Sequence, residues 1–322
     1  VTLNLRNIFV KPNVILIILF IWNHSSQGQI KLKYDTTHVD TVSFKIKRGF
    51  DVNDFIRMTK TDTSFFRAFK NLKMYPHISK NNVDIFDKEW NESAHLFRNA
   101  NHFSTGDTGW INIIKEVTNG KVYKKNGKHK YFTAEMYDKV FFAEGKFAVN
   151  NNVGDSYSQE SMNALSTKEK YYEKLKTFMF SPGTGVKGVP LIGKKLNIFD
   201  DKMLKYYDFK IEKTFFKDTV PCYKFSCVKR KDVQDKKVTI TKLITFYDRR
   251  TMKIIARTYA LKDNTAMFSF DIKMFIELKY EFEEYLPLKI KYNGEWNTPF
   301  KKGEKIKFEM NCSNYKDLII TK

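Results

Sequence analysis

The chain has 322 residues, of which 42% are hydrophobic and 16% aromatic, and its formal net charge is +21. The apolar fraction excludes a disordered chain, and the length is enough to bury a substantial core. The basic balance does not indicate a nucleic-acid partner, because the sequence has no arginine-rich helix, zinc-finger spacing or aromatic RNA-binding signature. Lysines instead alternate with apolar residues, as in Lys289-Ile290-Lys291, which is typical of the solvated face of a strand.

The first 28 residues have the pattern of a secretory signal. Arg6 and Lys11 form a basic region, residues 14–22 (VILIILFIW) an apolar region, and Ser26-Gln27-Gly28 a small-x-small cleavage site. The nine apolar residues are too few to cross a bilayer, which needs about 20. We predict a signal peptide at 1–28, a mature chain that begins at Gln29, and no transmembrane helix after the signal is removed.

The mature chain, 29–322, shows no break in composition, so we expect a single α+β domain with mixed helix and strand at 29–195. Asp51 is placed to cap a helical region at 51–73, whose later part has an apolar face. Further helices are predicted at 133–142 with Thr133 as the cap, and at 166–180 with Ser166 as the cap. Strands are predicted at 36–47, 82–87 and 93–103, a hairpin at 121–131 around Asn126-Gly127, and either strand or helix at 110–117.

The second part, 196–322, is nearly all strand. The predicted strands are 206–216, 221–230, 237–247, 252–262, 266–282, 286–292 and 305–312. Short polar breaks separate them, including Asn293-Gly294. Successive strands joined by short turns predict an antiparallel meander.

The stretch 268–282 organises this meander. Every second residue in it is apolar, from Phe268 through Ile276 to Phe282, and most of the residues between are charged. A period of two places the two sets on opposite faces of a strand. The run is longer than an average strand, so the sheet must bend or curl. The predicted fold class is α+β, with a long curved antiparallel sheet, a half-barrel-like meander, packed by two or three helices.

Motifs for chemistry are weak. Gly183-x-Gly185-x-x-Gly188 matches a dinucleotide-binding pattern, but a predicted helix precedes it where that pattern needs a strand. The histidines have no zinc-ligand spacing, and His95 and His102 should face opposite sides of one strand. The acids Asp200-Asp201, Glu281, Glu283 and Glu284 could supply a carboxylate pair for glycosidase chemistry, but acids at the ends of strands are usually solvated turn residues. We therefore predict no catalytic residue, no metal site and no cofactor.

The three cysteines are Cys222, Cys227 and Cys312. Because Cys222 and Cys227 are an odd number of residues apart, they face opposite sides of one straight strand and cannot bridge each other. Two interpretations stay open: buried free thiols, or one bridge to Cys312 across the sheet.

The apolar face of the long strand is the candidate site. It is either ordinary core or the lining of a cavity, because two or three helices, each about 10 Å wide, must cover some seven strands. The lining residues predicted for a lipid or acyl ligand are Phe270, Ile272, Met274 and Ile276.

Several runs carry a family resemblance, from about residue 157 to the end. They are SMNALSTKEKYYEKLKTFMFSPGTGVKGVPLIGKKLNIF, KDTVPCYKF, ITFYDRRTMKIIARTYAL and IKYNGEWNTPFKKGEKIKF. These runs resemble secreted Gram-negative envelope proteins of unknown function with a lipoprotein-carrier-like half-barrel, related to regions found next to carboxypeptidase-regulatory-like domains. The resemblance implies a fold and a compartment, and it supplies no catalytic residues.

The expected function is therefore an exported, non-enzymatic envelope protein in the periplasm or associated with the outer membrane. It would bind a lipid or acyl ligand, or an envelope protein, in the concave face of its sheet. The alternatives are an outer-membrane β-barrel, because strands of about ten alternating residues suit that class, or a periplasmic hydrolase with no recognisable motif.

Overall fold

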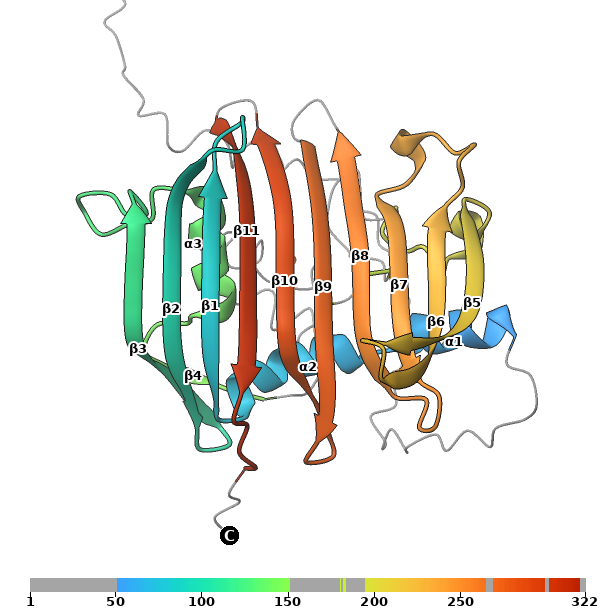
Figure 1. The fold of residues 1–322 in the computed structure, drawn as a ribbon, viewed down its shortest axis with the longest axis horizontal. Helices are drawn as coiled ribbons and strands as arrows, with labels where there is room; N and C mark the ends of the chain where they lie inside the picture. Colours follow the sequence, from blue (N-terminus) through green and yellow to red (C-terminus); the bar gives the residue numbers. More distant parts are fainter. Residues whose placement is uncertain are drawn as a thin grey trace, which may run out of the picture. The chain divides into compact units, whose positions relative to one another are not determined.

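The computed structural model describes residues 51–150, 180, 182–183, 195–264, 269–298 and 301–318. Residues 49–322 group into one compact unit. The described part of this unit is built on one open 11-stranded sheet with the order β4-β3-β2-β1-β11-β10-β9-β8-β7-β6-β5 (Figure 1). All neighbouring strands are antiparallel. The predicted fold class, α+β with a long curved antiparallel sheet, is confirmed.

Two runs of strands meet in this sheet. The first is β1 (His77–Phe86), β2 (Glu92–Ser104), β3 (Thr108–Gly120) and β4 (Lys146–Ala148). The second is β5 (Tyr207–Phe216), β6 (Val220–Lys229), β7 (Ile240–Asp248), β8 (Ile254–Asn264), β9 (Ser269–Glu281), β10 (Glu284–Thr298) and β11 (Lys301–Ser313). The second run is the predicted meander, and β11 joins it to β1. The ambiguous segment 110–117 is strand.

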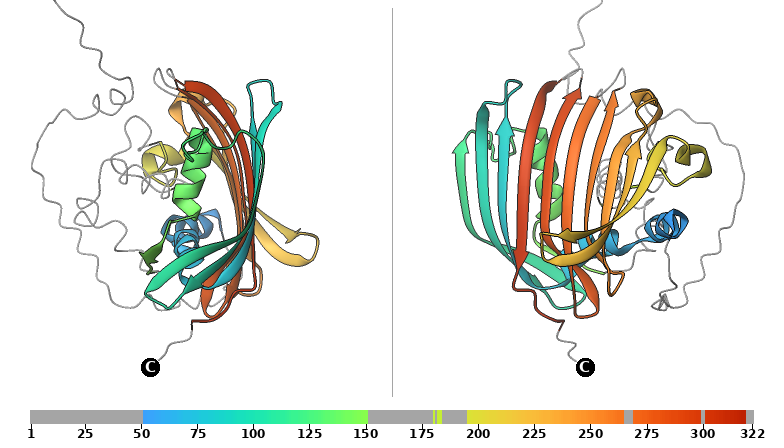
Figure 2. Two further views of the ribbon diagram at one scale, coloured as in Figure 1. Left: turned by 90° about the vertical axis from the view of Figure 1, so that its left-hand side faces the viewer. Right: turned by 45° about the vertical axis from the view of Figure 1, so that its right-hand side comes forward.

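The helices lie on the concave side of the sheet, as the edge-on view shows (Figure 2). They are α1 (Val52–Thr61), α2 (Ser64–Met74), α3 (Phe132–Phe141) and the one-turn α6 (Asp201–Leu204), with a 3-10 turn η3 at Asp235–Lys237. Asp51 caps α1 as predicted, because its side chain accepts a hydrogen bond from the Asp54 amide at 3.0 Å. The Asp54 side chain in turn accepts one from the Asp51 amide at 3.2 Å. No described helix has the length and apolar character needed to cross a membrane.

The predicted cap of α3 is wrong. Thr133 lies inside the helix, and Tyr131 at the N-cap makes no side-chain capping bond. The cap comes instead from β11: the Glu304 carboxylate accepts from the amides of Phe132 at 3.0 Å and Thr133 at 2.9 Å, and from the Thr133 hydroxyl at 2.7 Å. A carboxylate suits this end of a helix, where free N–H groups and the helix dipole carry positive charge.

The predicted hairpin at 121–131 is only partly present. Its turn forms, with the Gly127 amide donating to the Lys124 carbonyl at 3.0 Å, but one isolated bridge, Tyr123 to His129, replaces the two strands. The side chains explain the difference. Tyr123 bonds to Glu116 on β3 and His129 to Asp138 on α3, so the segment lies against the sheet edge and α3.

The predicted break at Asn293-Gly294 is also wrong, because β10 continues through it. Gly294 pairs with Ile272 on β9 and Ile306 on β11. A Cβ at position 294 would lie 2.2 Å from the Tyr292 hydroxyl, so the Tyr292 ring occupies the space that a side chain would need. The strand predicted at 36–47 and the helix at 166–180, apart from Phe180, lie outside the described residues.

Candidate functional site

The concave face of the sheet is made of cross-strand rows of buried side chains. The middle row, in which each residue pairs with the next, is Arg98, Asn81, Met310, Ile290, Ile276, Arg257, Thr245 and Phe225. The second row is Leu96, Val83, Phe308, Tyr292, Met274, Tyr259, Leu243 and Cys227. The third row is Ala94, Ile85, Ile306, Gly294, Ile272, Leu261 and Ile240. The second and third rows contain no charged side chain.

The four predicted ligand residues occupy successive positions down these rows. Ile276 lies in the middle row, Met274 in the second and Ile272 in the third, and Phe270 follows toward the start of β9. Their exposed fractions are 1–3%. The structure therefore brings all four to one buried face, and their role toward a ligand stays a prediction.

The predicted alternation of β9 holds at most of its positions. Asp271 and Lys273 are exposed, whereas Leu278 is buried with the other apolar residues. Glu277 departs from the pattern, being buried on the convex face, where Lys217 from the β5–β6 turn pairs with it at 2.5 Å. Tyr280, which the alternation predicts to be buried, is 44% exposed.

Helices and an irregular segment pack against different parts of the concave face. Helices α1 and α2 lie across the lower ends of the strands, and α3 lies behind β1 and β11 (Figure 1). The irregular segment 195–199 contributes Leu196, Ile198 and Phe199 to the same core, all at most 2% exposed. Its start is tied to the end of β8, where the Lys195 ammonium lies 3.2 Å from a carboxylate oxygen of Asp263. Part of this core therefore comes from a segment of turns, outside the helices and strands.

A buried ion pair holds α1 and α2 on this face. The Arg257 guanidinium of the middle row lies 3.0 Å from the Asp62 carboxylate, in the link between the two helices, and the two side chains are 2% and 9% exposed. Arg257 also donates from Nε to the Thr245 hydroxyl at 3.0 Å and stacks 4.2 Å over the Phe65 ring of α2. The link is thus fixed by charge, hydrogen bonding and ring contact together.

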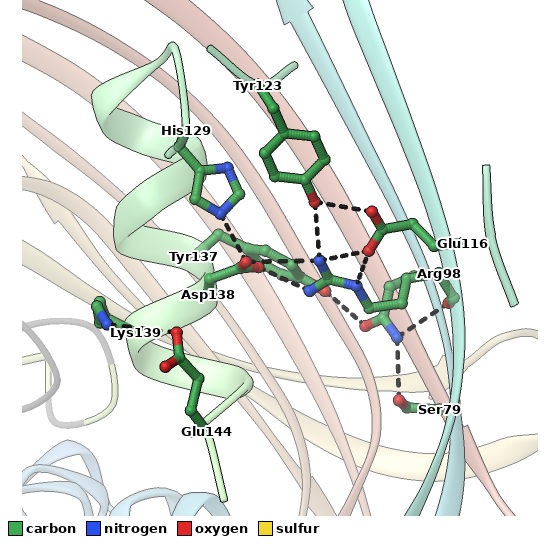
Figure 3. A network of polar contacts seen from close by, with 10 residues as sticks. Ser79, Arg98, Glu116, Tyr123, His129, Tyr137, Asp138, Lys139 and Glu144 are labelled. Carbon is green, nitrogen blue, oxygen red and sulfur yellow. Dashed lines mark hydrogen bonds and ion pairs between the residues drawn. The ribbon is translucent and has the colours of Figure 1, made fainter. Parts of the chain in front are cut away.

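The other arginine of the middle row, Arg98, holds α3 (Figure 3). It donates to Asp138 of α3 at 2.7 Å, to Glu116 of β3 at 2.8 Å and to the Tyr123 hydroxyl at 3.2 Å. His129 bonds to the same Asp138 at 2.6 Å. Burial alone raises the pKa of Asp138, but the hydrogen bonds from His129 and Arg98 lower it below its usual value. Every charge here has a partner, which suits an anchor rather than a reactive centre.

Sequence reasoning missed this network. The sequence feature that could have indicated it is an arginine among the inward-facing residues of an alternating strand. Arg98 shares the buried face of β2 with Ala94, Leu96, Ala100 and His102. Such a position predicts a buried arginine with acidic partners, although it does not say which acids supply them.

A buried histidine pair lies at the other end of β1 and β2. The rings of His77 and His102 stack with centroids 4.0 Å apart and planes 14° apart. The pKa of His77 is lowered to about 4 by burial, against a hydrogen bond between its Nδ1 and the Tyr75 carbonyl. Burial and the neighbouring His77 also lower the pKa of His102. Both rings are therefore neutral near pH 7.

His102 lines a small pocket of about 10 Å³. The other walls come from α2 (Phe69, Leu72, Lys73), α3 (Val140, Phe141) and β11 (Met310). Its lining is apolar except for His102 and Lys73, and Met310 belongs to the middle row. The pocket thus opens beside the apolar rows, at the seam between α2 and α3.

The remaining candidates do not gather into a site. His95 faces away from His102, as predicted, and bonds to Asp84. Glu283 lies in the β9–β10 turn, with a φ of 60°. Within the described ranges, no group of three or more His, Cys, Asp or Glu side chains could hold a metal ion.

The three cysteines are buried free thiols, which settles the choice left open by the sequence. Burial raises the pKa of the Cys312 thiol to about 12, although a hydrogen bond with Tyr315 opposes the rise. A thiol in this environment is a poor nucleophile, because the thiolate is the reactive form.

No protein-family model and no curated protein sequence matches the chain. Solved structures that are similar to it in part include the following three. A DUF1329 family protein from Desulfovibrio piger has 9% identity and a TM-score of 0.23, over 80% of this chain and 93% of that one. A putative outer membrane lipoprotein-sorting protein domain from Vibrio parahaemolyticus has 9% identity and a TM-score of 0.26, over 82% and 95%. A LolA superfamily protein from Nitrosomonas europaea has 8% identity and a TM-score of 0.20, over 81% and 99%.

These structures include the lipoprotein-carrier-like class that the sequence resembles. Their identities are all below 10% and their TM-scores below 0.3. At these values the similarity supports no conclusion about what this chain binds.

Proposed function

We propose that the protein is an exported, non-enzymatic protein of the cell envelope that binds the apolar chain of a lipid on the concave face of its sheet. The observation that carries this proposal is the set of uncharged rows around Phe270, Ile272 and Met274, part of whose cover is irregular chain. Burying an acyl chain there contributes about 0.8 kcal/mol per CH₂. A chain of ordinary length can therefore compete with the side chains that now cover the rows.

The exchange that we propose involves Leu196, Ile198 and Phe199. Because apolar burial is non-directional, these side chains and an acyl chain can occupy the same rows in turn. Helices α1, α2 and α3 are held by ion pairs and buried hydrogen bonds, whereas segment 195–199 forms one ion pair with the other described residues, at its start. We expect this segment to move before the helices do.

Two features favour this proposal over the alternative functions. The described sheet is open, with β4 and β5 as its edges, and helices lie in its concavity, which suits a binding module better than a closed barrel. Two of the acids weighed for hydrolase chemistry serve local structure, because Asp200 caps α6 and Glu284 accepts a hydrogen bond from Asn71.

Photo-crosslinking tests the binding site. The purified mature protein is incubated with palmitate carrying a diazirine near the end of its chain, irradiated and mapped by mass spectrometry. We expect labels on the peptide of 269–281 at its inward residues and on the peptide of 195–199. Labels confined to the convex face, for example at Lys273, would contradict the proposal. Native mass spectrometry of protein from the envelope should also show bound lipid.

Export is tested separately by N-terminal sequencing of the native protein. The basic and apolar regions of the first 28 residues predict that the mature chain begins at or near Gln29. A cytoplasmic protein that keeps residue 1 would refute the proposed compartment.

A further inference from the structure

The hydrogen bonds around Ser79 determine which nitrogen of His102 carries the proton. Ser79 Oγ lies 2.9 Å from the Asn81 amide nitrogen and 2.8 Å from His102 Nε2. The amide can only donate, so Oγ accepts from it and has its own hydrogen to give. His102 Nε2 is the one acceptor for that hydrogen among the described residues. This assigns the His102 tautomer with the proton on Nδ1.

That Nδ1–H group has no acceptor among the described residues. His102 is 6% exposed, and its recorded hydrogen bond uses Nε2. The neighbouring His77 ring does not help, since it lies parallel to His102 rather than in its plane. An N–H donor inside the protein that has no acceptor favours a ligand oxygen placed beside it.

The pocket beside His102 fits one such oxygen. Its volume of about 10 Å³ corresponds to roughly one water-sized group. Lys73, in the last turn of α2, is the one charged residue among those that line the pocket, and its ammonium lies 5.2 Å from the centre of the Phe147 ring on β4. A neutral donor and a cation together favour a carboxylate oxygen.

The pocket also borders the middle row, because the two share Met310. Its wall residue Met310 pairs with Ile290, which pairs with Ile276 of β9. Two strand spacings separate Met310 from Ile276, which is roughly 10 Å. An acyl chain whose head lies at His102 can therefore reach the middle row once the Phe69 and Phe141 side chains at the seam rotate.

We propose that the ligand is a fatty acid, whose carboxylate is bound by His102 Nδ1–H and Lys73 at the α2–α3 seam. This inference rests on the proposed function and adds the head group and its place. The chain lies over Met310 and continues toward Ile276.

Displacement of a fluorescent fatty acid from the purified mature protein tests the head group. We expect dodecanoate to displace the probe at concentrations about tenfold or more below those of dodecanol, as for a hydrogen bond to a charged group. Lys73→Gln should remove this preference and Lys73→Arg should retain it. Lys70→Gln, one turn earlier on the same helix, is the matched control and should leave it unchanged.

A second measurement needs no variant. The ¹⁵N resonances of His102 in the wild-type protein should show the Nδ1–H tautomer and should move when dodecanoate is added, but not when dodecanol is added. Equal affinity for the two ligands, or resonances unchanged by dodecanoate, would overturn the head-group assignment and leave the apolar site standing. Binding of dodecyl phosphate but not dodecanoate would overturn the carboxylate. Binding of none of the three would refute the proposed function itself.

Discussion

Removing the charge of Asp62 should destabilise the protein strongly, because its partner is a buried arginine. Asp62→Asn keeps the shape of the side chain and leaves the Arg257 guanidinium, 2% exposed, without its anion 3.0 Å away. Breaking a buried pair by removing one partner costs about 3–5 kcal/mol. The bond from Arg257 to Thr245 remains, but the guanidinium cannot reach water without moving α2 and the Phe65 ring above it.

The double variant Asp62→Leu/Arg257→Met separates the charge from the packing. Replacing a buried ion pair by apolar residues of similar volume is often neutral or stabilising. We therefore expect the double variant to lose much less stability than either single variant. The Thr245 hydroxyl loses its partner in the double variant, which costs about 1–3 kcal/mol and keeps the expected change slightly destabilising.

Urea unfolding followed by far-UV circular dichroism measures these changes through the midpoint and the slope of the transition. The control is Asp232→Asn, which breaks the pair of Arg230 and Asp232, whose side chains are 46% and 67% exposed, and should change stability little. If Asp62→Asn costs no more than this control, the pair does not act as a buried anchor. If the double variant costs the sum of the two single variants, the two residues are not coupled.

Three further predictions follow from the sheet and the histidine pair. Ile272→Ala should lower the free energy of unfolding by about 2–5 kcal/mol, because it leaves a cavity in the core, whereas Lys273→Ala should change it by no more than about 0.5 kcal/mol. Equal losses for the two variants in urea unfolding would refute the alternation of β9. Gly294→Ala should cost about 1–3 kcal/mol, because its Cβ would meet the Tyr292 ring, and unchanged stability would show that the ring moves freely. The pKa of His77 is about 4 in the folded protein and about 6.5 in the unfolded protein. Between these two pH values the unfolded state binds more protons than the folded state. The free energy of unfolding therefore falls as the pH drops from about 6.5 toward 4. Between pH 7 and 5 this loss is roughly 2 kcal/mol, and His77→Phe should reduce it; an unchanged pH dependence of the urea midpoint would contradict the assignment.

The sequence determined those features that depend on neighbours along the chain. A period of two is enough to place Phe270, Ile272, Met274 and Ile276 on one buried face, because alternate side chains of a strand point to opposite sides. The cap at Asp51 could be predicted for the same reason, since it bonds to a residue three positions away. The antiparallel meander followed from short turns between long apolar runs.

Only the tertiary structure decided which distant residues meet. The pairing of β1 with β11 places Arg98 in one row with Arg257. Arg98 then pairs with Asp138 of α3, and Arg257 pairs with Asp62 in the link between α1 and α2. The cap of α3 comes from Glu304, 171 positions from Thr133, and Gly294 fits within β10 because the Tyr292 ring fills the space beside it. Local periodicity does not carry such information: these contacts depend on the order and register of strands, which are set by packing the whole concave face at once.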